Sequence, residues 1–138
     1  MRQEDYLLRE IQRISLLLGG ILNKLGGGKN DTSISVSIQF EEMKEKLLND
    51  SGIDIDEFLS LTAVEIEQYI QKFSGLRGAN IELLADIFGL IGMEQDLTES
   101  AVCNEKALIL YELCNSRDRT FSMDRETKIK NITKILHP

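Results

Sequence analysis

The only proline of this 138-residue sequence is its last residue, Pro138. Proline lacks a backbone N–H and clashes with the preceding helical turn, so a chain without internal proline has no position at which a helix must break. Apolar residues make up 42% of the sequence, which is enough to build a buried core. We therefore expect an all-α fold, a helical bundle or an array of αα-hairpins.

The first segment carries the strongest helical pattern. Six apolar residues, which we call the seam, recur at spacings of four, three, four, three and four: Leu7, Ile11, Ile14, Leu18, Ile21 and Leu25. This is heptad spacing, which places one apolar stripe along a helix. It predicts an amphipathic helix over residues 1–25, followed by a glycine-rich joint over 26–33 and a helical domain over 34–138. The seam can pack on its own domain or pair with a second copy.

Start signals predict the later helices. Asp54 precedes Glu57 by three residues, and Thr62 precedes Glu65 by three, which is the spacing of a capping box. Together with the apolar periodicity, these signals predict about seven helices in all, the later ones over 34–49, 55–60, 63–74, 79–93, 98–115 and 122–136. Residues 33–38 alternate serine with Ile or Val, so the first turn of the 34–49 helix is open between helix and strand.

Two predicted helices within residues 78–116 resemble a tetratricopeptide (TPR) hairpin. The first has the pattern large-x2-Leu-Ala-x2-aromatic in Ile81, Leu84, Ala85 and Phe88, and the second has small-x3-aromatic-x2-small in Ala107, Tyr111 and Cys114. The resemblance implies an αα-hairpin that supplies a surface for a protein partner. The spacing departs from the TPR pattern, because Ala107 lies ten residues later than a regular 34-residue repeat would place it.

The whole chain also resembles a family of small, uncharacterised bacterial helical proteins. The similarity lies in the opening residues 3–9, in the 107–111 segment, and in Thr120-Phe121-Ser122 before a charged last helix. That family has no assigned activity, so the resemblance implies only an all-helical fold and a bacterial, cytoplasmic setting.

Charge is distributed unevenly along the chain. The net charge is −7, which counts against a nucleic-acid-binding surface. Residues 41–99 carry fourteen acidic and four basic residues, whereas residues 117–138 carry six basic and three acidic residues. The basic end either forms a solvated helix face or docks on an acidic partner, including the acidic middle of a second copy. The residues expected to make that contact are Arg117, Arg119, Arg125, Lys128 and Lys130.

The sequence lacks the parts of most catalytic sites. Its one histidine, His137, is next to last, and a general base must be held in place. Cys103 and Cys114 lie eleven residues apart in one predicted helix, about 16 Å along its axis, so they cannot form a disulfide there and are interpreted as small buried hydrophobes. We predict no enzymatic activity, no cofactor and no metal site.

The predicted function is a non-enzymatic protein-interaction or scaffold module. The seam predicts self-association through the N-terminal helix as a homodimer, and any other protein partner is left unknown. The alternative is attachment of the same amphipathic helix to a membrane surface. A small-molecule-binding bundle is a third hypothesis, for which the sequence carries no pocket motif. The acidic start and the lack of about 20 consecutive apolar residues favour a cytoplasmic protein without a leader or membrane span.

Overall fold

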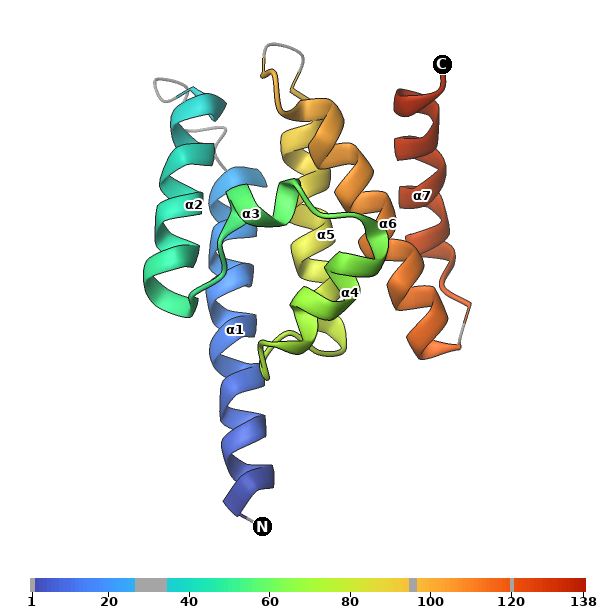
Figure 1. Ribbon diagram of the computed structural model, residues 1–138. Helices are drawn as coiled ribbons and strands as arrows, with labels where there is room; N and C mark the ends of the chain where they lie inside the picture. The colour runs from blue at the N-terminus through green and yellow to red at the C-terminus, as the bar shows by residue number, and fades with distance from the viewer. Residues whose placement is uncertain (1, 27–34, 95–96, 120) are drawn as a thin grey trace.

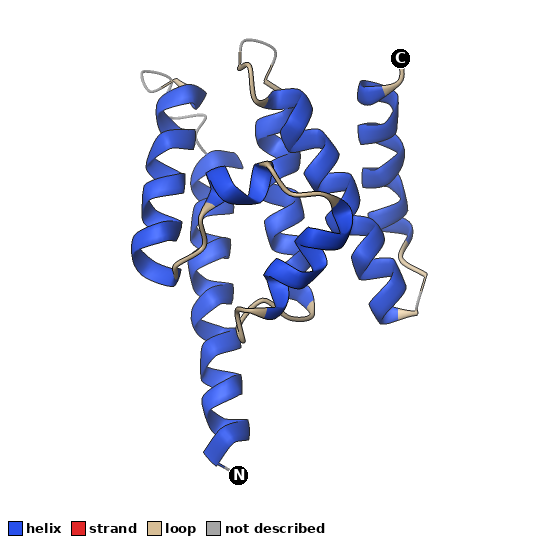
Figure 2. Ribbon diagram, in the orientation of Figure 1, coloured by secondary structure: helices blue, strands red, loops and turns tan. Residues whose placement is uncertain are grey.

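The computed structural model describes residues 2–26, 35–94, 97–119 and 121–138, and these ranges form seven helices and no strand (Figures 1 and 2). The all-α prediction is confirmed. The helices are α1 (Arg2–Gly26), α2 (Val36–Ser51), α3 (Ile55–Leu59), α4 (Ala63–Gln71), α5 (Ala79–Gly92), α6 (Ser100–Asp118) and α7 (Met123–Leu136).

Several helices begin where the sequence places an acceptor side chain. The Asp54 carboxylate accepts the backbone N–H of Glu57 at the start of α3. Thr62 and Glu65 form a reciprocal capping box at the start of α4, in which Glu65 Oε1 accepts the Thr62 N–H at 2.9 Å. The Ser122 hydroxyl oxygen accepts the backbone N–H of Arg125 at the start of α7. These contacts satisfy N–H groups that have no partner within the helix.

Two helix starts were less certain from the sequence. Ser35 caps α2, so residues 36–38, which were open between helix and strand, are helical; residues 33 and 34 lie outside the described residues. The helix predicted from Thr98 begins instead at Ser100, after Glu99, without a side-chain cap. The Thr98 hydroxyl donates to the Glu99 carboxylate at 3.0 Å, so it is not engaged with the backbone of α6.

Helix α5 lies at the centre of the fold (Figure 1). It packs against α1 on one side and forms an αα-hairpin with α6, its most extensive partner; α7 packs on α6, and α2 packs on α1. Phe88 of α5 stacks on Phe58 of α3 with ring centroids 5.3 Å apart. The seven residues quoted for the TPR resemblance are all buried: Ile81, Leu84, Ala85, Phe88, Ala107, Tyr111 and Cys114. The two cysteines are free and buried, as interpreted.

The central part of the seam packs on its own chain. Ile14, Leu18 and Ile21 are buried in the common core, whereas the seam residues nearer the two ends, Leu7, Ile11 and Leu25, are half-buried. Of the two ways to bury the seam, packing on its own domain therefore accounts for its middle three residues. The part of α1 nearest the N-terminus projects beyond the other helices (Figure 1).

Candidate functional site

An apolar groove of about 590 Å³ lies over α5, between α1 and α7. Its floor includes Gly89, Leu90 and Met93 of α5, and Leu22 stands on the α1 side. The remaining lining residues come from α5, α6 and α7: Asp86, Tyr111, Lys128, Asn131, Ile132, Lys134 and Ile135.

The groove exists because neighbouring helices cover only one side of α5. The buried residues of α5, such as Leu84 and Phe88, point into the core, whereas Leu90 and Met93 lie on the opposite side of the helix. Since α7 packs mainly on α6, it does not close over this side. Met93 remains 65% exposed and Ile135 48% exposed at the rim, so the groove is open to solvent at this end.

A second groove of about 540 Å³ adjoins the first and shares Met93 and Ile135 with it. Asn104 of α6 lies at its wall and is buried. The Asn104 side-chain amide donates to the Gly92 carbonyl at 2.9 Å, while its Oδ1 has no hydrogen-bond partner among the described residues. The hollow surface therefore continues past Met93 toward the start of α6, where Glu94, Thr98 and Ser100 make its lining more polar.

The other end of the first groove is charged. We call the groups gathered there the charge cluster, and they come from α5, α6 and α7: Glu82, Asp86, Tyr111, Asn115, Asp118, Asp124, Arg125 and Lys128. The Lys128 ammonium lies 3.1 Å from carboxylate oxygens of both Glu82 and Asp86. Arg125 lies 2.8 Å from Glu82 and 2.7 Å from Asp118. The Tyr111 hydroxyl donates to Asp86.

Burial and hydrogen bonds in the charge cluster hold the protonation states of Tyr111 and Lys128 constant near neutral pH. Burial raises the pKa of Tyr111, and its hydrogen bond to Asp86 raises it further. Burial alone would lower the pKa of Lys128, but hydrogen bonds to Asp86 and Glu82 outweigh burial and raise it. Both groups thus titrate farther from neutral pH than usual, whereas a general acid or base works best with a pKa near the working pH.

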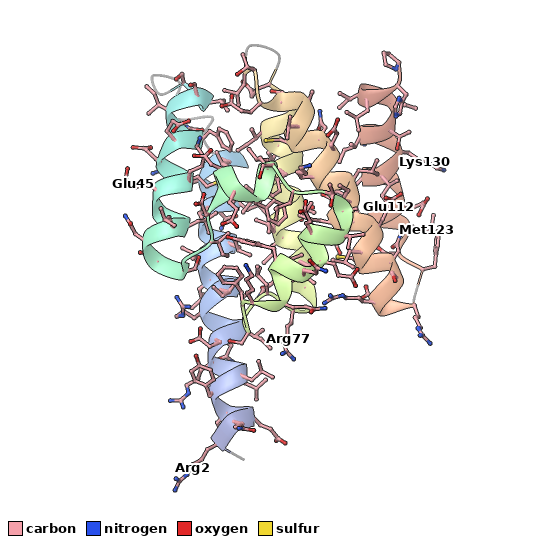
Figure 3. All side chains as sticks on the ribbon, in the orientation of Figure 1. Arg2, Glu45, Arg77, Glu112, Met123 and Lys130 are labelled. Atoms are coloured by element: carbon pink, nitrogen blue, oxygen red, sulfur yellow. The ribbon has the colours of Figure 1, made fainter. Side chains whose placement is uncertain are left out.

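The five basic residues predicted to meet an acidic partner do not share one surface. Arg125 and Lys128 belong to the charge cluster and pair with Glu82, which lies in the acidic 41–99 segment of the same chain. Those two basic residues are therefore engaged within the molecule. Arg117, Arg119 and Lys130 are exposed, and Lys130 points away from the helices (Figure 3).

The sequence did not single out the groove. None of the six seam residues lines it, although Leu22, one residue after Ile21, does. The available signal was α5 itself, because its apolar residue Leu90 and the following Met93 fall outside the face that forms the core. A helix that is apolar on more than one side needs cover on more than one side.

No cluster of metal-ligating side chains occurs in the part of the chain that the structure describes. Within the same residues, no helix has the length and apolar character needed to cross a membrane. Comparisons with protein-family models, curated proteins and solved structures found no match. The groove and α1 are therefore the features of the molecule that bear on its function.

Proposed function

We propose that this protein is a non-enzymatic interaction module whose groove over α5 receives one amphipathic helix of a protein partner. The observation that carries the proposal is the open apolar surface between α1 and α7. Helix-in-groove recognition lays the apolar face of a helix into such a surface, with anchors at positions i, i+4 and i+7. From Asp86 of α5 to Met93, the residue after it, the floor covers eight residues, or about 10 Å, which matches two turns of a bound helix.

The openness of the groove favours a helix over a small molecule. Small-molecule pockets bury about 70–90% of the surface of their ligand. Here Met93 is 65% and Ile135 48% exposed at the rim, so a small ligand would keep one side in water. A helix needs only one covered face, since its other side is polar.

The charges at the groove define the partner further. Lys134 lines the groove on the α7 side and is exposed, whereas Lys128 is engaged in the charge cluster. An acidic residue one turn away from the apolar anchors would lie within reach of Lys134. The expected partner is therefore a helix with an acidic residue followed by large apolar residues at i+4 and i+7.

A TPR-like hairpin and a cytoplasmic setting remain expectations for this interaction module. In this view the α5–α6 hairpin is the scaffold that presents the groove floor. The membrane-surface alternative is less well supported, because burial of Ile14, Leu18 and Ile21 removes the middle of the seam from any lipid contact.

A fluorescent reporter at the groove rim tests the proposal. Met93→Cys provides one exposed thiol, while burial raises the pKa of the native thiols Cys103 and Cys114 to about 12 and about 11. An environment-sensitive dye therefore labels position 93 selectively at neutral pH. The probe is a synthetic helical peptide with Glu, Leu and Leu at i, i+4 and i+7. The control peptide has the same composition with these residues on different faces.

At nanomolar labelled protein, we expect the first peptide to give a saturable blue shift and the control peptide to give none. Gly89→Leu, which fills the groove floor, should abolish the response. Equal responses to both peptides, or no response to either, would disprove helix binding in the groove.

A further inference from the structure

The N-terminal end of α1 makes few contacts with its own chain. We call residues 2–9 the tip. Contacts of α1 with the body follow just after it, where the Asn80 side-chain amide donates to the Ile11 carbonyl at 2.9 Å and Gly75 approaches Ile14. Before that point, Tyr6 is 56% and Leu8 is 58% exposed. The tip extends clear of the body, with Arg2 at its end (Figures 1 and 3).

The tip and the residue two positions after it carry the pattern expected of the partner helix. Glu4 and Leu8 of the tip and the seam residue Ile11 are spaced i, i+4 and i+7, so they share one face of α1. This face has an acidic residue followed by two large apolar residues. Leu8 is exposed and Ile11 is half-buried, so the face is largely uncovered in one copy of the chain.

On these grounds we infer that the partner helix is the tip of α1 from a second copy, so that two chains exchange tips across a two-fold axis. This inference rests on the function proposed above, because the groove is the same. It keeps the expected self-association through the N-terminal helix but places it on the face of α1 beside the seam, which shares only Ile11 with the seam.

The register of α1 fits such an exchange. Leu8, Ser15 and Leu22 are spaced by seven residues and lie on the same face as Glu4, and Leu22 lines the groove. When two α1 helices run antiparallel about a two-fold axis at Ser15, Leu8 of each copy is level with Leu22 of the other. Each tip then lies at the groove of its partner, and the same surface serves both chains, as two-fold symmetry requires.

The surroundings of that crossing leave space for a second helix. A Cβ placed on Gly19, one turn after Ser15, would meet no atom within 4 Å. Leu16 beside it is 79% exposed. A small side chain at the crossing lets two helices approach closely, and the second helix would cover Leu16 as well as Leu8.

Charge agrees with this placement. In the antiparallel register Glu4 lies one turn beyond the partner's Leu22, toward the end of the groove where α1 and α7 both finish (Figure 1). Lys134 lies on α7 at that end, beside Ile135. Each tip thus brings a carboxylate to the end of the partner groove that carries Lys134.

The oligomeric state of the full chain is the first test. Light scattering at micromolar concentration should give twice the chain mass of 15.6 kDa. Leu8→Asp should give a folded monomer, because Leu8 is exposed within one copy. Val64→Asp, on the 67% exposed Val64 of α4, is the matched control and should remain dimeric. A monomeric wild type, or a dimer that Leu8→Asp leaves intact, would overturn the inference.

A charge exchange identifies the contact. Glu4→Lys and Lys134→Glu should each weaken the dimer by about fivefold, since two exposed ion pairs are lost per dimer. A one-to-one mixture of the two variants should form a heterodimer of wild-type strength, because each tip then faces an opposite charge. Failure of the mixture to recover would place the dimer contact elsewhere.

Cross-linking locates the tip directly. A mixture of Leu8→Cys and Met93→Cys chains should form a mixed disulfide, and a mixture of Val64→Cys and Met93→Cys chains should not. Absence of the first cross-link in a dimeric sample overturns the exchange of tips. The dye-labelled Met93→Cys protein that also carries Leu8→Asp still reports peptide binding. Its response to the peptides therefore tests the proposed function separately from the exchange of tips.

Discussion

Glu82 and Arg125 lie 43 positions apart in the sequence, and one Glu82 carboxylate oxygen accepts hydrogen bonds from both Nε and Nη2 of the Arg125 guanidinium, at 3.1 and 2.8 Å. The contact joins the acidic middle of the chain to its basic end within one molecule. It also fixes where α7 lies relative to α5, and therefore how wide the groove is. The shape of the groove therefore depends on the ion pair between Glu82 and Arg125.

Replacing Arg125 by Met tests this arrangement. Arg125 is 6% exposed and also contacts Asp118 and Asn115, so its removal takes a buried donor away from the partly buried Glu82 and Asn115 and from the exposed Asp118. We expect a loss of about 3 kcal/mol in the free energy of unfolding, measured by urea denaturation. Arg119→Met, at an exposed position, should change it by less than about 0.5 kcal/mol. Equal effects of the two substitutions would contradict the structural role of the ion pairs.

The helices could be predicted from the sequence because their signals are local. Thr62 and Glu65 are three residues apart, and their reciprocal hydrogen bonds depend on nothing outside that turn. The start of α6 was not predictable in this way. Thr98 has the residue type of a cap, but its hydroxyl donates to the adjacent Glu99 carboxylate and α6 has no side-chain cap. The sequence does not reveal whether a threonine oxygen will accept a backbone N–H of the helix that follows.

The groove could not be predicted, because it depends on distant contacts. The sequence of α5 indicates that Leu90 and Met93 need cover beyond the core-facing side. Whether that cover comes from the same chain depends on where α7 packs, and α7 is held by Arg125 through residues of α5 and α6. The same limit applies to the seam. Its spacing shows that α1 is amphipathic, but it does not show whether the apolar face of α1 packs on its own chain or on a second copy.

The two threonines offer a matched test of helix capping. Thr62→Ala removes the side-chain acceptor of the Glu65 N–H and disrupts the capping box, so the free energy of unfolding should fall by about 1 kcal/mol. Thr98→Ala removes a hydroxyl that caps no helix and should leave stability nearly unchanged. Urea denaturation of both variants gives the comparison. A larger loss at Thr98 would mean that α6 is capped differently from this structure.

Buried thiols predict a loss of stability in alkaline solution. Burial raises the pKa of Cys103 to about 12 and that of Cys114 to about 11, from an ordinary value of 9.0. Above pH 9 the unfolded chain therefore loses protons that the folded chain retains, so the free energy of unfolding falls as the pH rises toward 12 and is unaffected below 9. Urea midpoints measured across this range should fall less steeply in Cys103→Ala. An unchanged slope would show that this thiol ionises equally in both states.

Two glycines of α5, three residues apart, should respond to alanine in opposite directions. A Cβ on Gly89 would lie 3.8 Å from the Tyr111 hydroxyl oxygen and 3.9 Å from Ile132, which is ordinary contact. Gly89→Ala should therefore raise the free energy of unfolding by about 0.5–1 kcal/mol through helix propensity. A Cβ on Gly92 would clash with the Asn104 side-chain amide, so Gly92→Ala forces Asn104 to move and should cost about 1–3 kcal/mol. Thermal unfolding of both variants measures the signs, and a stabilising Gly92→Ala would show that α5 and α6 are less closely packed than this hairpin requires.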